Sequence, residues 1–202
     1  MSEVTLVKQV IGITGGIASG KSNVCSVIKN EGYQIIDSDQ ISRDFSKKDY
    51  PIYNEIIKAF GEDYLDDNLE INRKKLAKLI FHNNEAKEKL NSITHPIIIE
   101  EIKKQIELAT DNIVFVEIPL LYEAKLEYLC DKVICVFLNK KTQVARLMER
   151  EGIDEDYALE KIHSQMDLYL KKTKADYVID SKGSFEETKN QVLEIIKKLK
   201  GV

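Results

Sequence analysis

Five short runs of apolar residues, each followed by a polar or glycine-containing turn, divide the chain. They span residues 9–14, 33–37, 112–118, 132–138 and 176–180 and are rich in β-branched side chains. Between them, apolar residues recur at spacings of three and four, which is typical of amphipathic helices. Strands that alternate with helices predict a parallel sheet covered by helices on both faces. We therefore expect an α/β fold with a five-stranded parallel sheet.

The long interval between the second and third runs contains only helical patterns. About seventy-four residues separate the two runs, and helical spacing covers residues 51–60, 72–81 and 83–93. Because proline is favoured at the first position of a helix, Pro96 is expected to open a further helix. These patterns predict a helical insertion over residues 46–110, which either holds a substrate or completes the core.

A second insertion, over residues 140–174, is rich in basic side chains and is expected to form a lid. Its cations include Arg146, Arg150, Lys161, Lys171, Lys172 and Lys174. The predicted core consists of the remaining residues, 1–45, 111–139 and 175–202. It closes with an amphipathic helix whose start is marked by a capping box of Ser184 and Glu187.

The composition is typical of an ordinary globular protein and limits the classes of partner that it could bind. The formal net charge of −4 disfavours a protein that is held on nucleic acid by bulk attraction to phosphate. Cys25, Cys130 and Cys135 lie in apolar stretches without the spacing of a zinc site or a disulfide framework. No apolar run reaches the ~18 residues of a membrane span, and residues 1–9 are too short and polar for a signal peptide. We expect a cytoplasmic protein with no nucleic-acid or membrane partner, and a monomer, with a homo-oligomer as the alternative.

The run from Gly15 to Ser22 fits the phosphate-loop pattern G-x-x-x-x-G-K-[ST] at every defined position. It lies between the first apolar run and a helical pattern over residues 21–30, as such a loop requires. Its glycines let backbone N–H groups point at phosphate oxygens, Lys21 reaches the β- and γ-phosphates, and Ser22 can hold Mg²⁺. The sequence therefore predicts a nucleotide-phosphate site, with a glycine-rich turn without ligand as the alternative.

Acidic side chains lie at the ends of two other predicted strands, where ligands bind in open parallel sheets. Asp37 and Asp39 could orient and deprotonate an acceptor hydroxyl, although Asp39 could also simply cap a helix over residues 40–45. Glu117, at the end of the third run, could be a metal-side acid that acts through water. For Glu123 the alternative to a functional role is a solvated helix residue.

The fourth run is followed by Asn139, Lys140, Lys141 and Thr142, which is close to the guanine-reading Asn-Lys-x-Asp of GTPases. Thr142 stands where the aspartate is required, and the Asp-x-x-Gly switch element is missing as well, so we exclude a GTPase. Farther along, Arg146 and Arg150 lie four residues apart and share a helix face. Guanidinium groups suit transferring phosphoryl oxygens, whereas a solvated basic face is the alternative.

Together these residues resemble the dephospho-coenzyme A kinase family. The similar elements are residues 13–22, 37–43, 90–97, 118–123, 143–150, 164–165 and 175–179, in an order and spacing that run through nearly the whole chain. The resemblance implies the phosphate-loop kinase fold and transfer of the γ-phosphoryl group of ATP to the ribose 3′-hydroxyl of dephospho-coenzyme A, with Mg²⁺. The alternatives are another small-metabolite kinase, for a nucleoside, a nucleotide or shikimate, and a nucleotide-gated binding module.

The resemblance also implies roles for individual residues. Asp39 is the expected base, and Lys21 and Arg146 are expected to neutralise the transferred charge. ATP is expected to contact Gly15, Gly16, Ile17, Ala18, Ser19, Gly20, Lys21, Ser22, Asn23, Arg146, Arg150, Ser181 and Gly183. The acceptor is expected to contact Thr14, Asp37, Asp39, Arg43, His95, Pro119, Leu120 and Leu121. Mg²⁺ is expected to contact Ser22 and Glu117.

Four positions depart from the family pattern. Asn23 replaces the usual Thr, Ser38 replaces Ala, Glu117 stands where Asp is common, and Ser181 replaces the frequent Asn. The departures bear on the metal role of Glu117 and on the adenine contacts of residues 181–183. His95, alternatively, is a helix cap or a satisfied core group.

Overall fold

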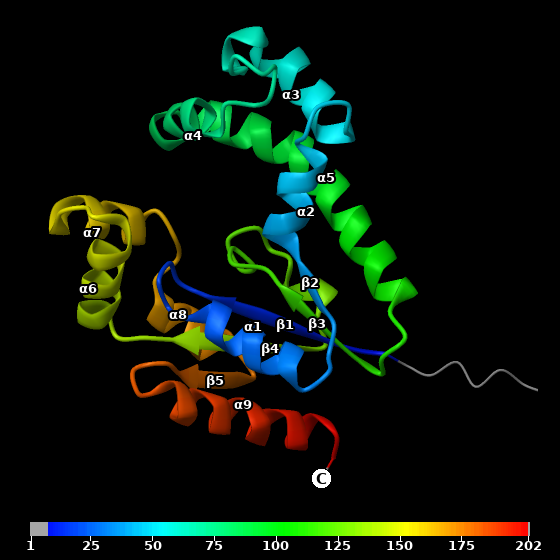
Figure 1. Ribbon diagram of the computed structural model, residues 1–202, viewed down its shortest axis with the longest axis vertical. Coiled ribbons are helices and arrows are strands. Elements are labelled where there is room, and N and C mark those ends of the chain that lie inside the picture. The colour runs from blue at the N-terminus through cyan, green and yellow to red at the C-terminus, as the bar shows by residue number, and fades with distance from the viewer. Residues whose placement is uncertain (1–7, 202) are drawn as a thin grey trace, which may run out of the picture. The chain divides into compact units, whose positions relative to one another are not determined.

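A computed structural model of the chain, which describes residues 8–201, contains a five-stranded sheet in the order β2-β3-β1-β4-β5 (Figure 1). The strands are β1 Gln9–Gly15, β2 Ile35–Asp37, β3 Ile113–Glu117, β4 Lys132–Phe137 and β5 Tyr177–Asp180. β1 pairs in parallel with β3 and β4, and β4 pairs in parallel with β5. The predicted five-stranded parallel sheet is confirmed, and each strand bound lies within two residues of its predicted place.

The described residues form two compact units. The first contains the chain up to Ile36 and from Ala109 onward, and the second is Asp37–Leu108. The predicted insertion covers residues 46–110, whereas the second unit begins nine residues earlier and so includes residues 37–45 of the predicted core. The substrate-holding role of the insertion and the lid role of residues 140–174 stay predictions.

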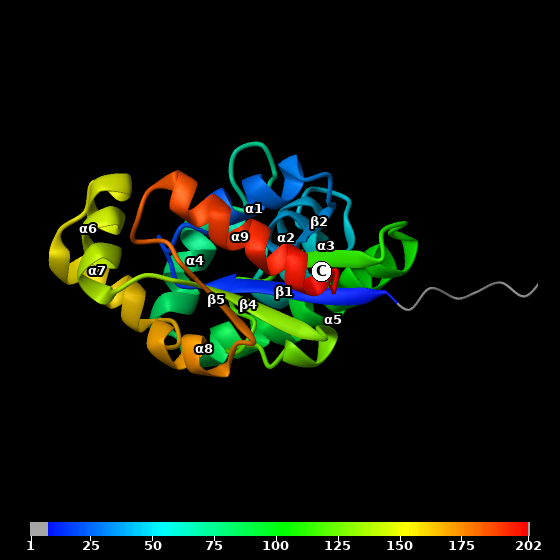
Figure 2. The same ribbon diagram turned by 90° about the horizontal axis from the view of Figure 1, so that it is seen from below.

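Helices cover both faces of the sheet in the first unit. Helices α1 Lys21–Asn30 and α9 Phe185–Leu199 lie on one face, and α8 Leu168–Lys174 lies on the other (Figure 2). Side chains alternate between the faces of a strand, so β4 sends Ile134 and Val136 toward α1 and α9 and Cys135 toward α8. The main core also takes apolar side chains from β1, α1 and α9, among them Ile11, Ile13, Val24, Val27, Ile28, Val192 and Ile196.

Helices α6 Lys140–Glu151 and α7 Glu155–His163 follow β4 in the first unit and pack against each other. Their contact is a small apolar cluster of Val144, Leu147 and Ala158, against which Ile17 and Ala18 of the predicted phosphate loop also pack. Helix α6 begins where the Asn139 side chain accepts from the N–H of Thr142. Asn139 is thus a helix cap.

The second unit is built from helices α2 Ser38–Phe45, α3 Pro51–Phe60, α4 Arg73–His82 and α5 Asn84–Leu108. Its core is formed by Ile52, Tyr53, Ile56, Ile71 and Leu76. Short 3₁₀ turns are present at Glu62–Tyr64 in this unit and at Glu127–Leu129 in the first unit. The predicted helices over residues 51–60 and 72–81 are confirmed within one residue.

The prediction that Pro96 opens a helix is wrong, because Pro96 lies inside the 25-residue helix α5. A proline inside a helix removes one backbone hydrogen bond and costs about 3 kcal/mol. Apolar residues on both sides of it, Leu90 before and Ile97 and Ile98 after, pack against the core of the second unit. This packing stabilises the helix on both sides of Pro96 and offsets the cost of the proline.

No helix among residues 8–201 is long and apolar enough to cross a membrane.

Candidate active site

The loop between β1 and α1 contains positions that only glycine fits. A Cβ atom on Gly15 would lie 2.6 Å from Ser19 Oγ and 2.7 Å from the Val136 carbonyl oxygen. Gly20 has φ of 90°, in the left-handed region that glycine adopts without strain. Ala18 has φ of 55°, the kind of backbone strain that clusters at ligand-binding turns. The spacing of the glycines therefore has a steric reason.

Carbonyl oxygens of this loop are engaged by side-chain donors. The pairs are Gly15 with Lys171 at 3.5 Å, Gly16 with Lys21 at 3.1 Å, Ile17 with Gln143 at 2.8 Å and Ser19 with Ser181 at 2.6 Å. In a trans peptide the carbonyl and the N–H of the next residue point in opposite directions. Holding a carbonyl oxygen therefore also aims the following N–H, which is what an anion-binding loop needs.

The loop also has the features expected of a phosphate cradle. Gly20 is the N-cap of α1, and no side chain among the described residues caps this helix end. The partial positive charge at the N-terminus of α1 therefore lies at the loop, where it favours an anion. Ser19 Oγ is buried and has no hydrogen-bond partner within residues 8–201, so a bound phosphate oxygen would satisfy it. These residues fit a nucleotide phosphate.

Two glutamines hold the backbone of Ile17 in the middle of the loop. The Ile17 N–H donates to Gln165 Oε1 at 2.9 Å, and its carbonyl accepts from Gln143 Nε2 at 2.8 Å. Gln143 is buried in α6, and Gln165 lies in the turn between α7 and α8. Because the Ile17 N–H already has an acceptor, its contact with phosphate stays a prediction.

The predicted lid arginines have different partners. Arg146 Nη2 donates to the Ser181 carbonyl at 2.8 Å, and the Ser181 hydroxyl donates to the Ser19 carbonyl, so both residues reach the loop. Arg150 instead pairs with Glu151 at 2.7 Å on an exposed part of α6. The structure thus joins Arg146 to the loop through Ser181 and leaves Arg150 at the surface.

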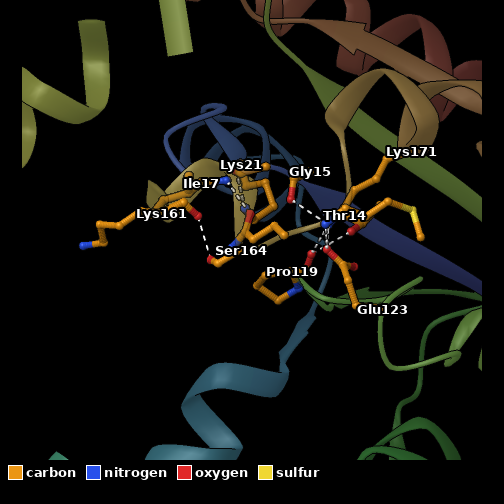
Figure 3. A network of polar contacts seen from close by, with 12 residues as sticks. Thr14, Gly15, Ile17, Lys21, Pro119, Glu123, Lys161, Ser164 and Lys171 are labelled. Carbon is orange, nitrogen blue, oxygen red and sulfur yellow. Dashed lines mark hydrogen bonds and ion pairs between the residues drawn. The ribbon is translucent and has the colours of Figure 1, made fainter. Parts of the chain in front are cut away.

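A buried polar network links the loop to the turn after β3 (Figure 3). The Thr14 hydroxyl and the Lys171 ammonium both donate to the Pro119 carbonyl, at 3.1 and 2.9 Å. Lys171 also pairs with Glu123 Oε1 at 2.7 Å, and this oxygen accepts from the Met166 N–H at 2.9 Å. The alternative of a solvated helix residue at Glu123 is wrong, because Glu123 lies in a turn and neutralises a buried cation.

The two residues predicted to hold Mg²⁺ offer oxygen ligands, which this ion prefers. Ser22 is exposed in the first turn of α1, and Glu117 is the half-buried last residue of β3. The Cys25 thiol donates to Glu117 Oε2 at 3.2 Å. No group of three or more His, Cys, Asp or Glu side chains within residues 8–201 could hold a metal alone. A hydroxyl and one acid suit an ion that keeps waters and binds substrate phosphates.

The predicted acceptor acids lie in the second unit, at the start of α2. Asp37 caps α2 by accepting from the Gln40 N–H at 2.9 Å, and its other carboxylate oxygen lies 3.7 Å from Arg43. The interpretation of Asp39 as the cap is wrong, because Asp39 is exposed within the first turn. His95 lies half-buried in α5, where burial lowers the pKa of its imidazole.

Four residues that hold the loop or its network were missed as site residues from the sequence: Lys171, Glu123, Gln143 and Gln165. Lys171 had the pattern of one more lid cation, yet it is fully buried. Its position three residues after the buried Leu168 was a usable signal, because both lie on the same face of α8. No such signal marks Glu123 or Gln165, whose partners are far away in the chain.

A phosphate loop that joins the central strand of a parallel sheet to a helix defines the phosphate-loop class of nucleotide-binding folds. Within that class, the chain belongs to the dephospho-CoA kinase family, whose family model, described as Dephospho-CoA kinase, matches residues 9–187.

Individual relatives and solved structures support this family membership. A dephospho-CoA kinase from Carboxydothermus hydrogenoformans is 44% identical over 198 residues, which cover 96% of each chain. The structure of a dephospho-CoA kinase from Campylobacter jejuni superposes with a TM-score of 0.71 at 31% identity, over 96% of this chain and 98% of that one. A crystal structure from Thermus thermophilus gives a TM-score of 0.84 at 26% identity, over 95% and 97% of the two chains.

Proposed function

We propose that this chain transfers the γ-phosphoryl group of ATP to the ribose 3′-hydroxyl of dephospho-CoA, the final step of coenzyme A synthesis. The observation that carries the proposal is the phosphate loop over residues 15–22 in a chain that matches the dephospho-CoA kinase family over residues 9–187. The loop supports ATP as the phosphoryl donor, and the family match supports dephospho-CoA as the acceptor.

On the donor side, the loop N–H groups and the N-terminus of α1 bind the β- and γ-phosphates. Lys21 and Arg146 neutralise the charge that moves from the γ-phosphoryl group to the leaving ADP. Asn23, Ser181 and Gly183 complete the proposed ATP contacts, with Arg150 as a peripheral contact because it is paired with Glu151 at the surface. The bonds that hold Arg146 and Ser181 near the loop support their part in this assignment.

On the acceptor side, Asp39 takes the proton of the 3′-hydroxyl as that oxygen attacks the γ-phosphorus. The bond from the phosphorus to the β,γ-bridging oxygen breaks, and ADP leaves. Asp37 orients the acceptor from the end of β2. In the second unit the proposed acceptor contacts are Arg43 and His95. In the first unit they are Pro119 and Leu120, and the fully buried Thr14 holds the Pro119 carbonyl in place. Leu120 is exposed and can meet a ligand, whereas Leu121 is buried and supports the turn.

Ser22 and Glu117 are the proposed protein ligands of Mg²⁺, Glu117 through a water molecule. When bound, the ion neutralises charge on the β- and γ-phosphate oxygens. The Cys25 thiol donates to Glu117 and so fixes the orientation of this carboxylate at the end of β3.

A coupled ADP-release assay tests the proposal. With ATP and Mg²⁺, we expect ADP to form only when dephospho-CoA is added, and phosphorus NMR to show a new 3′-phosphomonoester. Shikimate and adenosine serve as control acceptors. ADP release that is independent of dephospho-CoA, or transfer to shikimate at a higher rate, would contradict the proposal.

A further inference from the structure

Lys171 is fully buried, which is unusual for a lysine. It lies on α8 between residues that remain at or near the surface, and the next lysine, Lys172, places its ammonium 4.4 Å from the ring of Phe137. A buried ammonium is costly unless it is paired and hydrogen-bonded. The contacts of Lys171 therefore need an explanation beyond surface charge.

Every donor position of this ammonium has an oxygen within reach. The oxygens are the carboxylate of Glu123 at 2.7 Å and the carbonyls of Pro119 at 2.9 Å and Gly15 at 3.5 Å. An ammonium has three N–H donors, so the three oxygens match its capacity. They come from the phosphate loop and from the turn after β3, and Figure 3 shows Lys171 pointing toward them.

The same ammonium constrains the start of the loop by a second route. Pro119 offers one carbonyl oxygen, which accepts from Lys171 and also from the hydroxyl of Thr14. Thr14 directly precedes Gly15, so the last two residues of β1 are held both directly and through Pro119. The Gly15 carbonyl faces Lys171, and the Gly16 N–H of the same peptide therefore points away from it.

We propose that Lys171 is a positioning residue of the phosphate loop, an inference that rests on the proposed function of that loop. Its ammonium holds the Gly15 peptide and the Thr14 side chain in the orientation that binds nucleotide phosphate, before the nucleotide arrives. Glu123 supplies the counter-charge that makes a buried ammonium stable in this place. Lys171 itself is enclosed by protein and acts on the nucleotide through the loop.

The first test compares Lys171→Met with the matched control Lys172→Met, which removes a charge from the same helix without touching the loop. Calorimetric titration with ADP should show at least a tenfold weaker affinity for Lys171→Met and a change of less than twofold for Lys172→Met. In turnover, the KM for ATP should rise by a similar factor, whereas the KM for dephospho-CoA should change less than threefold. An unchanged ADP affinity in folded Lys171→Met would overturn the proposal.

A second variant separates positioning from simple support of the fold. Lys171→Met with Glu123→Gln removes both charges and keeps an oxygen for the Met166 N–H, so its melting temperature should recover from that of the single variant. The affinity of this double variant for ADP should remain at least tenfold weaker than that of the wild type. Recovery of stability and affinity together would assign Lys171 a structural role and overturn the proposal. If the wild-type chain binds ADP but fails to phosphorylate dephospho-CoA, the proposed function fails, while the ADP comparison still decides the role of Lys171.

Discussion

The side-chain amide of Gln143 donates to the carbonyl oxygen of Ile17 over 2.8 Å, from a buried position in α6 to the middle of the phosphate loop. A Cβ atom at Gly16 would lie 2.5 Å from Gln143 Nε2, so a side chain there would displace this amide from its place. A segment far along the chain therefore orders the loop backbone, and the glycine leaves room for the contact. This contact gives the predicted lid segment a direct connection to nucleotide binding.

Replacing Gln143 by Leu should weaken ATP binding. The substitution keeps the volume but leaves the Ile17 carbonyl without its donor, which costs about 1–3 kcal/mol, or roughly 5- to 150-fold in affinity if the loop must be ordered to bind. Gln105→Leu is the control, because Gln105 bonds the Glu101 side chain within α5 of the second unit and not the loop. Equal ATP affinities of the two variants, measured by titration, would show that the contact has no role in binding.

Asp39→Asn should separate nucleotide binding from turnover. Asparagine keeps the shape of the side chain but cannot accept the proton of the acceptor hydroxyl, a function worth typically 10²–10⁴-fold in rate. We expect ATP affinity within about twofold of the wild type and a loss of kcat in that range. Asp44→Asn, on the same helix and paired with Lys47, is the control. Near-normal kcat in Asp39→Asn would remove Asp39 from the role of base.

Arg146 and Arg150 should differ strongly although they lie on one helix face. Arg146 is held beside the loop by the Ser181 carbonyl, whereas Arg150 is paired with Glu151 at the surface. An arginine that stabilises transferring phosphoryl oxygens is worth roughly 10³–10⁵-fold in rate, and an exposed ion pair contributes about 1 kcal/mol or less. We expect kcat to fall about a thousandfold in Arg146→Met and less than tenfold in Arg150→Met. Steady-state kinetics on both variants decide this, and equal losses would reject the assignment.

The sequence predicts best those parts of the structure that depend on neighbouring residues. The strands follow from β-branched runs, and the phosphate loop follows from glycines whose missing side chains are sterically required. The prediction that Pro96 opens a helix failed, because the preference of proline for a helix start is outweighed by apolar contacts on both sides of it in α5. Likewise, the cap of α2 falls on Asp37 and not on Asp39, a difference of backbone position that residue type alone does not reveal.

The buried network of the site depends on distant residues and escaped prediction for that reason. Lys171 and Glu123 are 48 positions apart, and each alone has the character of a surface residue. Their pairing exists only because α8 covers the sheet face above the turn that follows β3. Contacts of this kind need the complete fold, since the helical spacing that puts Lys171 on the buried face of α8 does not tell which distant acid it will meet.

His95 should make stability depend on pH in the weakly acidic range. Burial lowers the pKa of its imidazole, so the unfolded chain takes up a proton near pH 6.5 while the folded chain stays neutral. Above this pH, ionisation of His95 therefore does not affect the free energy of unfolding. As the pH falls from about 6.5 toward the lower pKa of the folded state, the free energy of unfolding decreases. Urea unfolding from pH 7.5 to 5.5 should show a steeper loss for the wild type than for His95→Asn. Parallel curves for the two proteins would contradict the assignment.

The three cysteines should resist alkylation and disulfide exchange in the folded protein. Burial raises the pKa of the Cys25 thiol, and the neighbouring Glu117 carboxylate raises it further. Burial also raises the pKa of Cys130 to about 12 and that of Cys135 to about 11. Since the thiolate is the reactive form and a free cysteine has a pKa of about 8.5, each should react at pH 8 at least a hundredfold more slowly than free cysteine.

An aromatic disulfide reagent at pH 8 measures this directly, because each thiol that reacts releases a coloured product. We expect almost no release from the folded protein and the release of three equivalents per chain in strong denaturant, since all three cysteines are free. The rate in the folded protein should rise about tenfold per pH unit between pH 8 and 10, because the thiolate fraction grows in that proportion below the raised pKa values. Cys130→Ser serves as the control, since Cys130 is the least buried of the three. A fast single equivalent that persists in Cys130→Ser would show that Cys25 or Cys135 is accessible, and would exclude the closed packing of Cys25 against Glu117 and of Cys135 beneath α8.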